Sequence, residues 1–149
     1  MIRYPFHIYQ DEECPEYWIG AIPGVGGSPT SCFMTQGKTP EEVRASGPSL
    51  LDGYILVRMK HSLPLEEAQP LPKAKGWEWL YPTSQVLVAM QIREAREKAD
   101  LTQAEAVKLM GVSQAAYGRW EQLGKCNATL GTLERIARVL GRKLEVTLK

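Results

Sequence analysis

The 149-residue sequence contains little of what disulfide-rich, metal-binding or membrane proteins depend on. Its three cysteines, Cys14, Cys32 and Cys126, are odd in number and form no C-x-x-C pair, so neither a disulfide framework nor a zinc site is predicted. The two histidines have no evident carboxylate or cysteine partner, and we expect no metal and no other cofactor. The longest apolar runs cover only a few residues, too few for a secretory signal or a membrane-spanning helix. We therefore expect a protein of the reducing cytoplasm.

The charged residues are divided unevenly along the chain. Residues 1–82 contain seven Lys/Arg and ten Asp/Glu, a net charge of −3, whereas residues 83–149 contain eleven and seven, a net charge of +4. Apolar residues make up 44% of the chain, which is ordinary for a globular protein with a buried core. An acidic N-terminal half and a basic C-terminal half predict two domains with different partners.

Two helix-start signals lie close together in the basic half. Thr102 followed by Glu105 is a capping box, in which the hydroxyl and the carboxylate each bind a free backbone N–H, and it predicts a helix from about residue 103. Gly111 is placed where a chain that leaves a helix often turns left-handed. Ser113 can cap a second helix over residues 114–122. Because so short a turn makes the helices cross steeply, a helix-turn-helix is predicted.

The second of these helices has an inner side and an outer side. Tyr117 and Trp120, three residues apart, form the inner side. The outer side combines two long hydrogen-bonding side chains, Gln114 and Arg119, with small residues that leave a groove open. Gln can read adenine in the DNA major groove, Arg can read guanine, and a small methyl group can contact thymine. A polar helix face is more often simply solvated, but this one lies in a basic segment.

A wider pattern surrounds the two helices and resembles the Cro/phage-repressor helix-turn-helix family. The resemblance covers residues 92–141 and is carried by residues 92–97, 101–103, 111–113, 130–133 and 140–141, which keep order and spacing together. It implies phosphate contact by the first motif helix, base contact by the second, and backbone contact by the loop that follows. The implied DNA-binding residues are Gln103, Ser113, Gln114, Ala115, Ala116, Arg119, Lys125, Asn127 and Thr129.

The acidic half, residues 1–81, is predicted to form a small α+β domain. Residues 2–9 alternate as a strand, and strands are also predicted at 17–22, 30–35 and 77–81. Residues 23–29 are expected to form a loop, and residues 61–76 a proline-rich connector. The stripe formed by Trp77, Trp79 and Tyr81 is expected to belong to the core.

One helix is predicted within this domain. Thr39 caps it, Pro40 takes the first helical position, and Glu42 completes a second capping box. We expect the Gly47-Pro48 pair to kink or restart the helix, because an interior proline deletes a hydrogen bond and clashes with the preceding turn. The later part, including Val57 or the stem of Arg58, is expected to cover the sheet.

A second resemblance joins the two halves. Residues 22–24 and 32–42 resemble the L-P-G-C-x-T-x-G-x-T-x-E-E signature of HicB-type antitoxins, with an insertion at residues 25–31. The resemblance implies a reduced RNase H-like fold for the first domain, and one subgroup of these antitoxins carries a C-terminal Cro-type helix-turn-helix. It also implies a partner, a small basic ribonuclease toxin of the HicA type.

A negative hairpin end would suit a toxin surface that is built to hold RNA phosphates. The hypothetical toxin interface consists of Asp11, Glu12, Glu13, Glu16, Tyr17 and Trp18. An ordinary solvated turn explains the same acidic residues equally well. The first strand offers no carboxylate to a metal-dependent nuclease site, so we expect the domain to be catalytically silent.

The chain closes on an alternating segment. Leu144, Val146 and Leu148 alternate with polar residues over 143–149, which predicts a strand at the end of an otherwise all-α domain, residues 83–149. Because a lone strand has an unpaired edge, we expect a homodimer that pairs two such strands and binds two operator half-sites. Two alternatives to an antitoxin that represses its own operon remain, a stand-alone repressor whose first domain senses a small molecule and an active nuclease.

Overall fold

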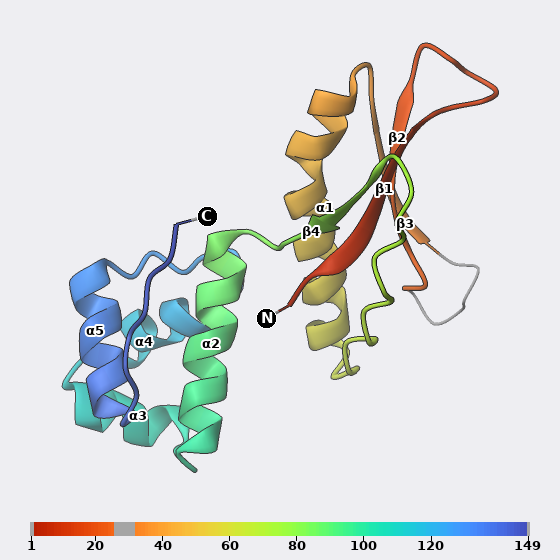
Figure 1. Cartoon of the computed structure of the whole chain (residues 1–149). Helices are drawn as coiled ribbons and strands as arrows, with labels where there is room; N and C mark the ends of the chain where they lie inside the picture. The colour runs from red at the N-terminus through yellow and green to blue at the C-terminus, as the bar shows by residue number, and fades with distance from the viewer. Residues whose placement is uncertain (1, 26–31, 149) are drawn as a thin grey trace. The chain divides into compact units, whose positions relative to one another are not determined.

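The computed structural model describes residues 2–25 and 32–148 and divides into two compact units, Met1–Thr83 and Ser84–Lys149 (Figure 1). Val25 is the one residue of the predicted insertion at 25–31 that is described. The predicted loop at residues 23–29 also lies mostly outside the described residues.

A four-stranded antiparallel sheet forms the first unit with one helix. The strands are β1 Tyr4–Gln10, β2 Trp18–Pro23, β3 Cys32–Gly37 and β4 Trp77–Leu80. Their order across the sheet is β3-β2-β1-β4, and all neighbouring strands are antiparallel. The four strands predicted from alternation and turn residues are present, with ends shifted by a few residues.

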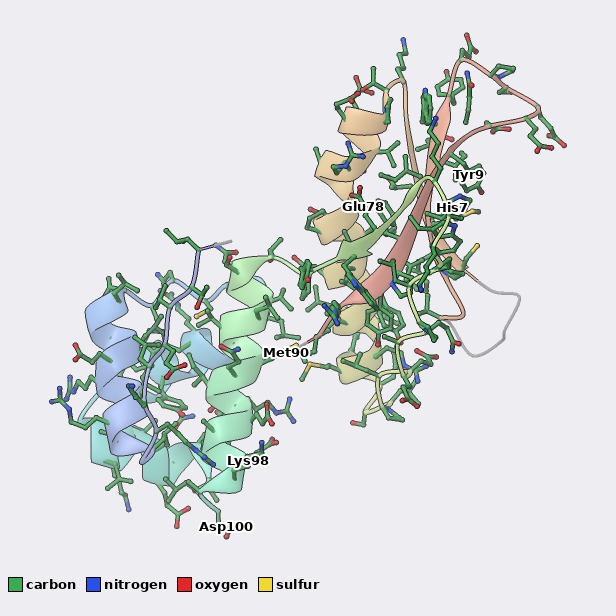
Figure 2. All side chains as sticks on the ribbon, viewed as in Figure 1. His7, Tyr9, Glu78, Met90, Lys98 and Asp100 are labelled. Carbon is green, nitrogen blue, oxygen red and sulfur yellow. The ribbon has the colours of Figure 1, made fainter. Side chains whose placement is uncertain are left out.

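Strand β1 packs one side into the core, and its other side is buried at Pro5 and half-buried beyond it. Tyr4, Phe6 and Ile8 are buried, as their alternation predicts. His7 and Tyr9 lie half-buried on the opposite side (Figure 2), and the His7 ring stacks on that of Trp77 with 4.3 Å between centroids. Burial lowers the pKa of His7, so the neutral imidazole is favoured at this position.

The aromatic stripe of β4 is not the core of the domain, contrary to expectation. Trp77, Trp79 and Tyr81 are only half-buried, and the fully packed residue of β4 is Leu80, at 5% exposure. The Arg3 guanidinium lies 4.1 Å from the centre of the Trp79 ring. The stripe faces away from the core because Leu80, rather than the tryptophans, packs beside the helix.

Helix α1, Pro40–Lys60, runs through Pro48 without interruption, so of the two expected outcomes the restart is wrong and the kink stays a prediction. A Cβ on Gly47 would lie 2.8 Å from Leu80 Cδ1, which shows how closely the helix approaches the sheet. Leu51, Tyr54 and Ile55 are 0% exposed beyond the proline. Burying three large side chains gains roughly 1.5–3 kcal/mol each, more than the cost of about 3 kcal/mol for one interior proline.

Two details of α1 also differ from expectation. The Thr39 hydroxyl caps the helix by accepting from the Glu42 N–H at 3.1 Å, but the Glu42 carboxylate accepts from the Lys38 N–H at 2.7 Å instead of completing a capping box. Val57 is 49% exposed and does not cover the sheet, because it lies off the stripe of buried residues along the helix.

The connector after α1 has no regular secondary structure but is tied to the first unit. The Tyr4 hydroxyl donates to the Glu66 carbonyl at 2.6 Å, and the Glu66 N–H donates to the Tyr54 hydroxyl at 3.1 Å. Further on, the N–H and hydroxyl of Thr83 both donate to the Asp52 carboxylate, at 2.9 and 2.7 Å. The chain is therefore held to α1 up to the end of this unit.

Four helices form the second unit: α2 Ser84–Lys98, α3 Gln103–Met110, α4 Gln114–Glu121 and α5 Leu130–Val139. Helices α3 and α4 begin where their caps predict. Residues from all four helices and the following turns share one buried core, made of Ala89, Ile92, Ala106, Met110, Tyr117, Cys126, Ile136 and Leu140.

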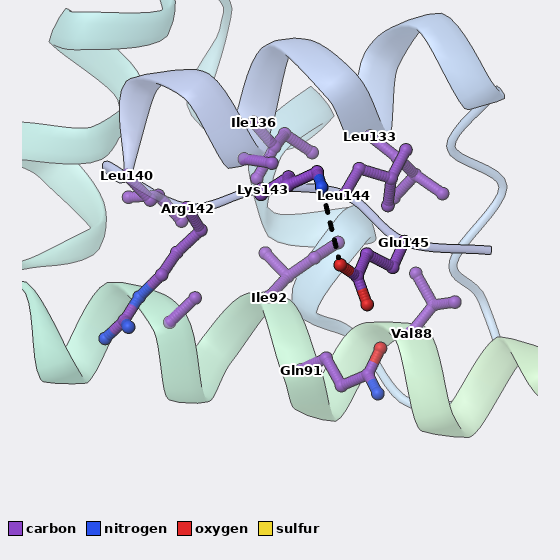
Figure 3. Close-up of a pocket in the computed structure, with 12 residues that line it drawn as sticks. Val88, Gln91, Ile92, Leu133, Ile136, Leu140, Arg142, Lys143, Leu144 and Glu145 are labelled. Carbon is purple, nitrogen blue, oxygen red and sulfur yellow. Dashed lines mark ion pairs between the residues drawn. The ribbon is translucent and has the colours of Figure 1, made fainter.

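The predicted C-terminal strand is not formed in the single chain. Residues 143–148 have no regular secondary structure, because an isolated strand edge has no partner here to pair with. Leu144 is half-buried and helps to line a groove of about 370 Å³ between α2 and α5, together with Leu133 and Ile136 on one side and Val88 on the other (Figure 3). The remaining tail, residues 145–148, is exposed to solvent, with Val146 and Leu148 at 61% and 95% exposure.

Candidate nucleic-acid interface

The two motif helices are fixed by their own end signals. The Thr102 hydroxyl accepts from the Glu105 N–H at 3.2 Å, and the Glu105 carboxylate accepts from the Thr102 N–H at 2.7 Å, which completes the predicted capping box. These hydrogen bonds from Thr102 lower the pKa of Glu105. Gly111 ends α3 with φ 63°, in the left-handed conformation that glycine adopts freely. The Ser113 hydroxyl then caps α4 by accepting from the Ala116 N–H at 3.1 Å.

Helix α4 presents the outer face that its sequence predicts. Gln114, Ala115 and Arg119 are exposed, while Ala116 and Gly118 are half-buried. On the inner side Tyr117 is 0% exposed, and Trp120 packs partly buried against the core. The five outer residues therefore lie together on one helix, with two long side chains free of the core.

A buried ion pair joins α2 to the end of α4. The Arg96 Nε donates to Glu121 Oε1 at 2.6 Å, and its Nη2 donates to Oε2 at 3.0 Å. Only 11% of the Arg96 side chain and 3% of the Glu121 side chain are exposed. The remaining Nη1 of Arg96 donates to the Leu101 carbonyl at 2.7 Å, just before α3. The Arg96 guanidinium of α2 thus binds both the end of α4 and the segment just before α3.

Hydrogen bonds extend from this pair to the outer face of α4, called the reading face below, which consists of Gln114, Ala115, Ala116, Gly118 and Arg119. The Gln103 amide donates to Glu121 Oε2 at 2.9 Å and accepts from the Gln114 amide at 3.2 Å. Two residues that sequence reasoning assigned separately to phosphate and base contact are therefore connected. Their orientation depends on Arg96 and Glu121, which the sequence analysis did not single out. One available signal was the charged Glu121, four residues after Tyr117 on the inward side of the helix.

The loop between α4 and α5 carries the remaining predicted DNA contacts. Lys125, Asn127 and Thr129 are all exposed in this loop. The Thr129 hydroxyl also caps α5 by accepting from the Thr132 N–H at 3.2 Å. Arg135 has a structural partner as well, since its guanidinium donates to the Met110 carbonyl at the end of α3. Arg135 therefore holds α3 to α5 in addition to carrying positive charge.

The hypothetical toxin-binding residues lie at the turn between β1 and β2. The Asp11 carboxylate accepts from the N–H groups of Glu13 and Cys14 at 2.9 and 3.3 Å and so shapes this turn. Glu12, Glu13 and Glu16 are exposed, and none of the four acidic residues forms an ion pair within the part of the chain that the structure describes. The neighbouring pair at the start of β2, Tyr17 and Trp18, is half-buried.

The described residues contain neither a metal-ion cluster nor a membrane-spanning helix. No three histidine, cysteine or acidic side chains come close enough together to hold a metal ion in residues 2–25 and 32–148. In the same part of the chain, no helix combines the length and the apolar character needed to cross a bilayer.

Steeply paired capped helices, a small-residue reading face and a shared core define a DNA-binding domain of the helix-turn-helix class. The sequence model of the helix-turn-helix family matches residues 92–146, which run from α2 into the tail. The chain therefore contains a domain of this family, as the resemblance over residues 92–141 predicted, and such domains bind DNA sequence-specifically and regulate transcription. A search of curated proteins found no match to the chain.

Proposed function

We propose that this chain is an antitoxin that represses its own operon. Its C-terminal unit binds operator DNA, and its N-terminal unit binds and inhibits a HicA-type ribonuclease without catalytic activity of its own. The observation that carries the DNA-binding half is the exposed side of α4, where Gln114 and Arg119 extend beyond Ala115 and Ala116. Side chains of these types at the N-terminal part of a second motif helix can reach base edges in the major groove.

Base-reading and phosphate-binding residues should respond differently to substitution. Arg119→Ala is expected to weaken operator binding by roughly 1–3 kcal/mol and to relax the preference at one base pair. Lys125→Ala should weaken binding to all sequences alike and lower the salt slope by about one unit. Titrations of the full chain against operator variants at several salt concentrations separate the two outcomes. A uniform loss for both variants would move Arg119 to the phosphate-binding class.

The antitoxin half is supported by sequence and surface together. Residues 22–24 and 32–42, which carry the resemblance to HicB-type antitoxins, form the end of β2, strand β3 and the capped start of α1. An antiparallel sheet with one helix is compatible with the reduced RNase H-like fold that this resemblance implies. The unpaired acidic turn supplies a negative surface for a ribonuclease that must bind RNA phosphates.

Charge reversal at this turn should weaken toxin capture. The double substitution Glu12→Lys and Glu13→Lys leaves the turn-shaping Asp11 carboxylate in place. We expect affinity for the toxin to fall at least about tenfold at low salt, mainly through slower association, since rim charges steer encounter. A matched control reverses Glu67 and Glu94, which are also exposed and change the net charge equally. Equal effects of the two double variants, or unchanged affinity, would remove the acidic turn from the interface.

Co-expression with a small basic reading frame next to the gene tests the proposal as a whole. We expect the two proteins to co-purify, RNA to be cleaved by the neighbour alone, and cleavage to stop when this chain is added. The chain alone should leave RNA intact with and without divalent metal. Nuclease activity lost on mutation of Asp11 or Glu16 would instead make the first unit an enzyme, and failure to co-purify would favour a stand-alone repressor.

A further inference from the structure

Gly118 lies inside α4, and neither the backbone conformation nor the packing of the folded chain requires a glycine there. Its φ is not positive, so the backbone there does not demand glycine. A Cβ built at this position meets nothing within 4 Å. At Gly20, by contrast, packing requires a glycine, since a Cβ there would lie 2.4 Å from Phe6 Cζ.

This glycine makes α4 less stable than alanine would. Glycine loses more backbone entropy on folding than other residues, and it is among the weakest helix formers. Helix α4 is also short, at 8 residues. No contact in the folded chain offsets this cost, and the space at Gly118 is therefore open to a partner outside the chain.

The open space beside Gly118 continues into a hollow of about 600 Å³. The hollow is lined by Gly118 together with Arg93 and Arg96 of α2, Thr102 and Gln103 at the start of α3, and Glu121 and Gln122 at the end of α4. The Glu121 carboxylate is neutralised there by its ion pair with Arg96. Arg93 pairs with Glu97 at 2.8 Å, but both side chains are about half exposed, so this pair is weak and can exchange for another anion. The start of α3 adds the positive end of a helix dipole.

We infer that Gly118 provides clearance for the sugar–phosphate backbone of duplex DNA, so that one phosphodiester enters this hollow and reaches Arg93 and Gln103. The inference rests on the proposed DNA binding and adds a residue to it. A methyl group at position 118 would project into the hollow and hold the backbone away from both side chains. Gly118 thus makes close docking of α4 possible by lacking a side chain.

Gly118→Ala is expected to raise the Tm of the C-terminal unit by a few degrees and, in the same protein, to weaken operator binding about tenfold, the size expected for overpacking one contact. The salt slope should fall by about one unit because one phosphate contact is lost. Gly53→Ala is the matched control, since Gly53 lies inside α1 and a Cβ there also meets nothing within 4 Å. It should stabilise the N-terminal unit and leave DNA binding unchanged.

A second substitution tests the route through Arg93. In the wild-type background, Arg93→Gln should lower the affinity and the salt slope, whereas in the Gly118→Ala background it should change little, because the phosphate is already displaced. If Gly118→Ala stabilises the unit but binds its own promoter fragment as well as wild type, or if the two substitutions are additive, the inference is wrong. If the wild-type chain shifts no promoter fragment in dilute buffer, both the inference and the proposed DNA binding fail.

Discussion

Glu121→Gln is expected to lower the free energy of unfolding of the C-terminal unit by about 3–5 kcal/mol, because the buried Arg96 guanidinium then keeps only the exposed Glu97, at 3.9 Å, as a counter-charge. The Glu121 side chain is 3% exposed and accepts from Arg96 at 2.6 and 3.0 Å and from Gln103 at 2.9 Å. For a domain of this size the loss corresponds to a fall in Tm of roughly 12 °C or more. Calorimetry of the full chain measures the shift, and hydrogen exchange of the α4 amides assigns it to this unit.

Glu97→Gln is the matched control for this substitution. Glu97 accepts from Arg93 at 2.8 Å and also lies 3.9 Å from Arg96 Nη2, but the Glu97 and Arg93 side chains are 53% and 48% exposed. Exposed pairs of this kind contribute about 0–1 kcal/mol. We therefore expect the control to shift the unfolding transition little. Similar losses for Glu97→Gln and Glu121→Gln would show that the buried pair contributes no more than a surface pair.

The Glu121 carboxylate should also set an acid limit for this unit. Burial raises the pKa of Glu121, but hydrogen bonds from Arg96 and Gln103 outweigh burial, and the pKa lies below its ordinary value of 4.5. A pKa that is depressed by folding stabilises the ionised native state, so this contribution is complete above about pH 5 and is lost as pH falls through the lower, folded-state pKa. Glutamine does not titrate, and the stability of Glu121→Gln should therefore vary less over this acid range.

The helix-turn-helix was predictable because its signals are local. Thr102, Glu105, Gly111 and Ser113 specify both motif helices through hydrogen bonds that span a few residues, and the structure contains each of them. The outer face of α4 follows from the same helix boundaries. Sequence reasoning was therefore most accurate for the part of the candidate site that depends on short-range geometry.

Pro48 shows where local reasoning failed. The sequence predicts a break there from the intrinsic cost of an interior proline. The helix nevertheless continues, because Gly47 lets it approach Leu80 closely and the residues that follow are buried against the sheet. That gain depends on contacts between segments far apart in the sequence, since Gly47 and Leu80 are 33 positions apart.

The Arg96–Glu121 pair escaped prediction for a similar reason. The two residues are 25 positions apart, and each resembles an ordinary charged residue of a solvated helix. Only the crossing of α2 and α4 buries both and places them beside Gln103. The sequence thus identifies the residues of the reading face more readily than the network that holds that face in position.

Deleting residues 143–149 is expected to convert a homodimer into monomers and to lower operator affinity by at least about 10²-fold. The proposed dimer pairs two tails as antiparallel strands and presents two α4 helices to half-sites about 34 Å apart. Linked binding at two sites exceeds the affinity of either site by about 10²–10⁴-fold, and a monomer loses this gain. Sedimentation of the full chain and of the truncated chain gives the oligomeric state, and promoter titration gives the affinity.

A less disruptive variant distinguishes loss of pairing from loss of folding. Deletion also removes Leu144 from the groove beside Leu133 and Val88, which by itself destabilises the unit. Val146→Lys with Leu148→Lys leaves Leu144 in place and changes only side chains that are 61% and 95% exposed in the single chain. Such residues contribute little to the fold of a monomer, but like charges placed opposite one another in a paired ribbon are destabilising. This double variant should therefore fold as stably as wild type, remain monomeric and bind a single half-site normally. A stable dimer in either variant would mean that the two copies associate through another surface.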